Sequence, residues 1–107
     1  MIQENVVVKT IATNYPNIQI LLSGQLVISN AAQIKKELLT ALTNFQSIDL
    51  VFENVIKADI AFLQLLIALR KSAIGLDKQV SFDAPASNYL KSLIKNTGLE
   101  QILLFSH

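Results

Sequence analysis

The sequence predicts an α/β fold, with a single domain over residues 1–107, a mixed sheet of about five strands and helices mainly on one face. Strand-like segments alternate with helix-like segments along the chain, which indicates parallel neighbours joined by helical crossovers. Two strand-like segments carry polar residues on one face, whereas strands covered on both faces are apolar throughout. Apolar residues make up 51% of the chain and charged residues 16%, so the composition supports a substantial core.

The first half of the chain predicts a hairpin followed by an amphipathic helix. Residues 6–11 are rich in β-branched side chains, and residues 18–22 form a second strand-like run beyond the turn at residues 14–17. Asn30 is the expected N-cap of the helix, with Gln33 in a capping-box position. The apolar stripe at helical spacing consists of Ile34, Leu38, Ala41, Leu42 and Phe45.

The middle of the chain predicts a strand followed by a very apolar helix. Apolar residues alternate with polar ones over residues 47–53, which is typical of a strand with one covered face. A helix is expected from Asp59 to about Ala73, with Gly75 as its stop. Because this helix has almost no polar face, it supplies more apolar surface than a one-sided layer buries. Ile60 and Phe62 are therefore expected to be exposed for contact with another protein.

The last third predicts a strand, a helix and a short final strand. Residues 79–83 alternate like the preceding strand, and a helix is expected to open at Pro85 and to end near Gly98. Residues 102–105 form the last strand-like run. The expected order is β-β-α-β-α-β-α-β, with the first strand antiparallel through its hairpin.

The composition excludes several classes of chemistry. There is no cysteine, and the one histidine, His107, is the last residue, so thiolate sites and histidine-based catalysis are not expected. The three glycines form no phosphate-binding loop. A net charge of +1 without a basic cluster argues against a nucleic-acid binder. Neither a cofactor nor a metal is expected, and the protein is predicted to be non-enzymatic.

Carboxylates near one sheet edge keep an enzymatic alternative open. Glu53, Asp59 and Asp83 follow strand-like segments and could hold a magnesium ion, as in a phosphoaspartyl receiver. The structural interpretation is that Asp59 caps the helix that follows it, a position where aspartate is favoured. No apolar run is long enough to span a membrane, and the first residues do not match a signal peptide, so a cytoplasmic location is expected.

Four segments in this order resemble the STAS family, the fold of bacterial anti-sigma factor antagonists. Leu-Ser-Gly-Gln-Leu at residues 22–26 is similar to the family's Leu-Ser-Gly-Glu-Leu. Residues 47–53 resemble the strand before the family's functional turn, and residues 58–63 lie where the family has Asp-Ser-Ser-Gly-Leu. The helix opening at Pro85 and the pair Gly98-Leu99 resemble its later helix and Gly-Leu ending.

The resemblance implies a partner-binding scaffold without its phosphorylation switch. In phosphorylatable members, a kinase that is also the anti-sigma factor modifies the second serine of the motif. Here Asp59 keeps the aspartate, Ile60 replaces the first serine, Ala61 replaces the phosphoacceptor and Phe62 replaces the glycine. Neither Ile60 nor Ala61 carries a hydroxyl, so serine phosphorylation at this turn is not expected.

The leading hypothesis is therefore a non-catalytic protein-interaction module of the antagonist type in bacterial signalling and transcription regulation. The alternative is an accessory or adaptor subunit of an ABC-type transport or chemotaxis complex, which the Asp-x-Ala-x-Leu-Gln-Leu-Leu form also resembles. The expected partner is an anti-sigma factor or serine kinase-like protein, a transporter or chemotaxis subunit, or a second copy of the chain. The expected partner-binding residues are Gly24, Ser29, Asn30, Lys57, Asp59, Ile60, Ala61 and Phe62.

Overall fold

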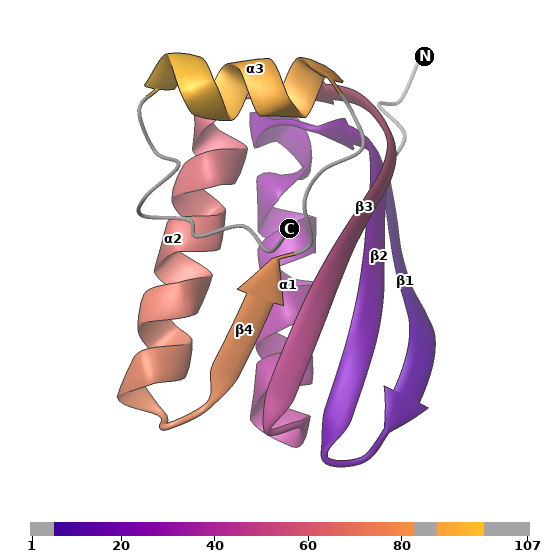
Figure 1. Ribbon diagram of the computed structural model, residues 1–107, viewed down its shortest axis with the longest axis vertical. Helices are drawn as coiled ribbons and strands as arrows, with labels where there is room; N and C mark the ends of the chain where they lie inside the picture. The colour runs from indigo at the N-terminus through magenta and orange to yellow at the C-terminus, as the bar shows by residue number, and fades with distance from the viewer. Residues whose placement is uncertain (1–5, 83–87, 98–107) are drawn as a thin grey trace.

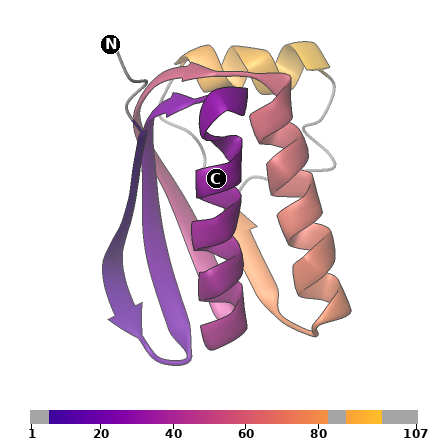
Figure 2. The ribbon, with the colours of Figure 1, turned by 180° about the vertical axis from the view of Figure 1, so that it is seen from behind.

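The computed structural model describes residues 6–82 and 88–97, and it confirms the α/β fold with a mixed sheet (Figure 1). Helices α1 and α2 lie over one face of the sheet, and α3 lies across one of its ends (Figures 1 and 2). In chain order the elements are β1 (Val6–Asn14), β2 (Asn17–Leu26), α1 (Ile28–Asn44), β3 (Ser47–Ala58), α2 (Ile60–Gly75), β4 (Gln79–Phe82) and α3 (Asn88–Thr97).

The described strands form one sheet of four, in the order β1-β2-β3-β4. β1 pairs antiparallel with β2 through the predicted hairpin, whereas β2, β3 and β4 are parallel neighbours. The hairpin turn also fixes the start of β3, because the carbonyl oxygen of Pro16 accepts from the amides of Gln46 at 2.8 Å and Ser47 at 3.3 Å. The helical crossovers α1 and α2 each return the chain to the end of the sheet where β2 begins, so that β3 and β4 run parallel to β2.

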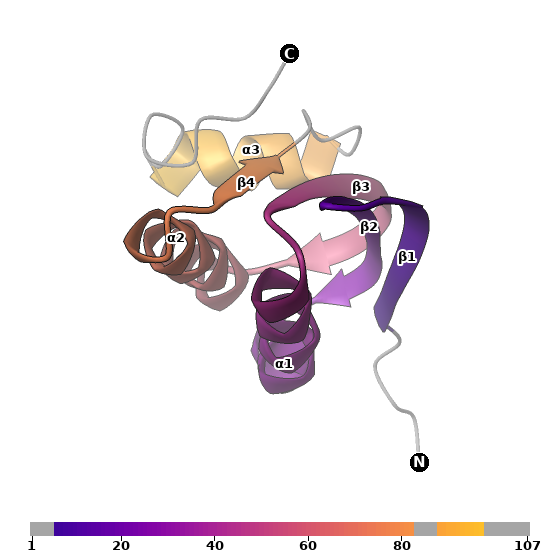
Figure 3. The same ribbon diagram turned by 90° about the horizontal axis from the view of Figure 1, so that it is seen from below.

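Among the described elements, α1 and α2 form a helical layer on one face of the sheet only, as the polar positions on the strands predict (Figure 3). On the opposite face, the Asp49 carboxylate accepts from the Gln19 amide at 3.0 Å and from the Ser81 hydroxyl at 3.2 Å. These three residues are register partners on β2, β3 and β4, so their hydrogen bonds run across the sheet. Cross-strand polar pairs of this kind stabilise a face that no helix covers.

The core lies between the sheet and the two covering helices. Strand residues at alternate positions face inward, and α1 and α2 contribute one stripe each. Fully buried large side chains come from five elements: Leu22, Leu26, Ile34, Leu38, Leu42, Ile48, Leu50, Phe62, Leu63, Leu66 and Phe82.

Two basic side chains anchor the C-terminal halves of α1 and α2 to neighbouring elements. Lys78 donates from Nζ to the carbonyl oxygens of Leu42 and Thr43, which belong to the last turn of α1. Arg70 of α2 donates to the carbonyl of Val80 at 3.2 Å and stacks 4.3 Å from the centre of the Phe82 ring. Burial lowers the pKa of the Arg70 guanidinium, although the group stays charged at neutral pH.

The exposure predicted for Phe62 is wrong. Its side chain is 0% exposed, and its ring meets that of Phe52 edge to face, with centroids 6.2 Å apart and planes at 88°. An apolar helix gives no periodic signal for which side faces inward, so the sequence did not separate Phe62 from Ile60. The structure places Ile60 outward, at 51% exposed.

The predicted starts and stops of the helices also need correction. α1 begins at Ile28 after Val27, so Asn30 lies within the first turn and is not the N-cap. Gly75 is the last residue of α2, and the chain leaves the helix through Leu76 and Asp77, whose φ of 58° provides the left-handed turn.

β3 is longer than predicted. It continues past residue 53 to Ala58 through Asn54, which has a positive φ of 51° next to a register irregularity with β2. The predicted start of the last helix at Pro85, its end near Gly98 and the final strand at residues 102–105 lie outside the described residues.

The burial of Phe62 generates a stability prediction. Phe62→Ala removes a fully buried ring, so we expect the free energy of unfolding in urea to fall by about 3–5 kcal/mol. Ile60→Ala, two residues away on the exposed side of the same helix, is the matched control and should change it by less than about 0.5 kcal/mol. Equal losses for the two variants would contradict the assignment of faces.

Candidate protein-interaction site

The candidate site lies at the end of the molecule where α1 and α2 begin. Parallel pairing sets Leu26, near the end of β2, beside Ala58, the last residue of β3. The next residue, Asp59, donates its amide to the carbonyl of Leu26 at 3.3 Å. Both helices therefore start at the same end of the sheet, and they run side by side over its face toward the opposite end (Figure 2).

The Asp59 carboxylate joins the two helix starts. One oxygen, Oδ1, accepts from the amide of Phe62 at 3.1 Å and caps α2, as the sequence predicts. The other, Oδ2, accepts from the amide of Ile28 at 2.9 Å, the first residue of α1. A negative charge at this place also interacts favourably with the positive ends of both helix dipoles.

Asn30 fastens the start of α1 to the strand before it. Its side-chain amide donates to the carbonyl of Gln25 at 2.8 Å, and its backbone amide donates to the carbonyl of Val27 at 2.9 Å. The first turn of α1 is thus held by Asn30 on one side and by Asp59 on the other. Ser29, at the second helical position of α1, is exposed.

Three exposed aliphatic side chains belong to the elements that meet at this end of the fold. Ile28 is 71% exposed at the start of α1, Ile60 is 51% exposed at the start of α2, and Ile56 is 65% exposed near the end of β3. Lys57 is exposed between the last two, and Ala61 is half-buried. We call Ile28, Ile56 and Ile60 the isoleucine cluster.

Sequence reasoning identified Ile60 but missed Ile28 and Ile56. A signal was present for Ile56, because Val55 and Ile56 are adjacent in a strand and point to opposite sides, so one of them must face away from the core. Ile28 could not be placed while the helix was expected to start at Asn30.

The structure brings most of the predicted partner-binding residues to this end of the fold, with two corrections. Phe62 belongs to the core and offers no surface. Gly24 is buried within β2, where its φ of 88° explains the need for glycine, so it supplies backbone geometry and no contact surface. The predicted residues that reach the surface, in full or in part, are Ser29, Asn30, Lys57, Asp59, Ile60 and Ala61.

Metal chemistry finds no support in residues 6–82 and 88–97. No three carboxylate, histidine or cysteine side chains in these ranges lie close enough to hold a metal ion. Both oxygens of Asp59 accept backbone hydrogen bonds, and Asp83 lies outside the described residues.

Among the described helices, none is long and apolar enough to cross a membrane.

Comparison with solved structures identifies the architecture. The chain is similar to the anti-sigma factor antagonist SpoIIAA in its unphosphorylated form, with a TM-score of 0.71 and 16% identity, over 96% of this chain and 89% of that one. The fold is STAS-like. The phosphorylated form of SpoIIAA, a Bacillus cell fate determinant, matches with a TM-score of 0.68 and 16% identity, over 96% of this chain and 92% of that one.

The comparison with solved structures confirms the STAS-like fold that the four sequence segments predict. No family model matches the sequence, and no curated protein matches it either. The four segments that resemble the STAS family in the sequence are thus consistent with an architecture that covers almost the whole chain.

The double role of Asp59 generates the second prediction. Asp59→Ala leaves the amides of Ile28 and Phe62 without an acceptor, so we expect a loss of about 2 kcal/mol and a fall in melting temperature of roughly 10 °C. Glu53→Ala removes an exposed carboxylate from β3 and is the control, with an expected change below about 0.5 kcal/mol. If thermal melts show no difference between the two variants, the bridging role is wrong.

Proposed function

We propose that this protein is a non-catalytic protein-interaction module of the anti-sigma factor antagonist type, acting in the bacterial cytoplasm. The observation that carries the proposal is the isoleucine cluster around helix starts that Asp59 holds in place. The likeness of the fold to SpoIIAA, whose structures are those of an antagonist, supports the same class of role.

The isoleucine cluster favours a protein partner over a small substrate. Burying an aliphatic side chain against a partner is worth roughly 1.5–3 kcal/mol, and exposed groups of such side chains mark interaction surfaces. The cluster lies on backbone that hydrogen bonds fix at both helix starts, so little ordering is needed when a partner binds. Lys57 and Asp59 add opposite charges that can set the orientation of the partner.

The missing hydroxyl at position 61 supports binding without a serine switch. Ala61 is the second residue of α2, close to helix amides that would favour a phosphate. A phosphoryl group there would add roughly −1.5 to −2 charge beside the isoleucine cluster and disrupt an apolar contact. Because Ala61 has no acceptor oxygen, we propose that regulation acts on the amount of the protein or on its partner.

Partner identity separates the two roles that the sequence left open. An anti-sigma factor or serine kinase-like protein would support the antagonist role in transcription regulation. A transporter ATPase, permease or chemotaxis protein would support the adaptor role instead. The surface proposed for the contact is the same in both cases.

Ile60→Asp is expected to abolish capture of the native partner from lysate while the melting temperature stays within a few degrees of wild type. The new charge faces solvent in the free protein and is desolvated only in the complex. Affinity capture followed by mass spectrometry measures the first effect, and a thermal melt measures the second.

Ile74→Asp is the matched control for this capture. Ile74 is 71% exposed on the same helix but near its opposite end, so the same charge there should leave capture unchanged. Loss of capture in both variants, or in neither, would count against the isoleucine cluster as the contact.

Insensitivity to serine kinases is the fourth prediction. After incubation with lysate and ATP, phosphosite mapping should find no stoichiometric phosphate at the start of α2, and partner binding should persist. Ile60→Ser with Ala61→Ser restores the hydroxyls and should make binding sensitive only if the partner is itself a kinase. A stoichiometric phosphate on Ser29 that weakens binding would overturn the proposal, because Ser29 is exposed at the same position of α1 as Ala61 in α2.

A further inference from the structure

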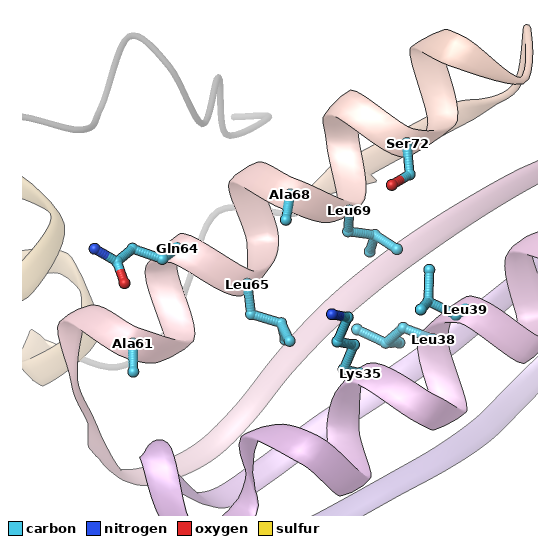
Figure 4. Close-up of a pocket in the computed structure, with 9 residues that line it drawn as sticks. All are labelled: Lys35, Leu38, Leu39, Ala61, Gln64, Leu65, Ala68, Leu69 and Ser72. Carbon is cyan, nitrogen blue, oxygen red and sulfur yellow. The ribbon is translucent and has the colours of Figure 1, made fainter.

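A groove of about 490 Å³ runs between α1 and α2 on the side of the helices that faces away from the sheet (Figure 4). α1 contributes Leu38 and Leu39 to its lining, and α2 contributes Leu65 and Leu69. The α2 side extends from Ala61 to Ser72, which corresponds to about 16 Å along the helix axis. The first lining residue on α2, Ala61, follows Ile60 of the isoleucine cluster in the chain.

Small residues on α2 leave room for another backbone. Ala61, Ala68 and Ser72 line the groove at spacings that keep them on one side of the helix, and Ala68 and Ser72 are exposed. With side chains this short, a third helix can approach α2 closely while its apolar side chains enter between the leucines. Three turns of helix match the length of the groove, which is the geometry of helix-in-groove recognition.

The charge around the groove is positive. Lys35 lines it, and its side chain reaches from α1 into the space between the helices (Figure 4). Lys71 lies on the outer side of α2, seven residues from Gln64 and so on the same face as that lining residue. α2 contains no acidic residue, and the one on α1, Glu37, is two positions from Lys35 and so points to a different side.

We propose that this groove binds an amphipathic helix of the partner protein, about three turns long, with an apolar face and an acidic residue that pairs with Lys35. The inference rests on the proposed function and names the part of the partner that the module recognises. The charge decides between candidate occupants. Two copies of this chain packed groove to groove would bring two lysines and no carboxylate from the groove lining into one interface, whereas an acidic helix is complementary to Lys35.

The test uses two stapled peptides of about 15 residues, long enough to stay helical once cross-linked. Both present leucines at i, i+3, i+4 and i+7, and one carries glutamates beside the leucines where the other carries lysines. Fluorescence anisotropy with the full chain should show roughly tenfold tighter binding of the acidic peptide, and the difference should shrink as salt is added.

Three substitutions test where the acidic peptide binds. Ala68→Glu fills the groove and adds a negative charge like that of the acidic peptide. The dissociation constant of the acidic peptide should therefore rise roughly tenfold or more. Ile74→Glu adds the same charge at an exposed position of α2 outside the groove and should change it less than about twofold. Lys35→Glu should reverse the preference, so that the lysine peptide binds more tightly than the glutamate peptide.

Four results would overturn the inference. Equal binding of the two peptides, or unchanged preference in Lys35→Glu, would show that charge complementarity plays no part. Displacement of the acidic peptide by dodecanoate below its micelle concentration would indicate an acyl-chain site. A wild-type dimer in sedimentation equilibrium that Ala68→Glu dissociates would assign the groove to a second copy.

Failure of this inference can be told apart from failure of the proposed function. If Ile60→Asp abolishes partner capture and Ala68→Glu does not, the isoleucine cluster is the contact and the groove is not. If neither variant affects capture, the partner does not bind at this surface, and the proposed function fails together with the inference.

Discussion

One carboxylate determines how the two covering helices begin. Because β2 and β3 are parallel neighbours, the connections to α1 and α2 leave the sheet side by side, and each helix start presents amides that lack a partner. Asp59 accepts from one amide of each helix, from Ile28 and from Phe62. The relative position of the helices, the isoleucine cluster and the groove between α1 and α2 all depend on this junction.

The same arrangement suits the molecule to recognition of a partner. Two polar side chains near the helix starts hold the structure together, Asp59 by accepting from helix amides and Asn30 by donating to the strand before α1. The exposed aliphatic side chains of Ile28 and Ile60 remain accessible, together with the charge of Lys57 and a groove that Lys35 lines. A rigid apolar surface with a few orienting charges is what a binding module requires.

Local patterns predicted the order of the described elements and the cap at Asp59, because strand alternation and capping act over a few residues. The errors arose where a distant residue decides. Asn30 was expected to cap α1, yet the acceptor at that helix start comes from Asp59, 31 positions along the chain. Phe62 and Ile60 belong to one apolar segment, and only packing against Phe52 determines which of them turns inward.

The most direct test of the account is hydrogen–deuterium exchange of the chain alone and in complex with its captured partner. We expect added protection in residues 28–39 and 57–72, which hold the isoleucines of both helix starts and the groove, and no change in β1 or β4. Protection confined to β1, β4 or the sheet face that carries Asp49, with both helices unchanged, would contradict it.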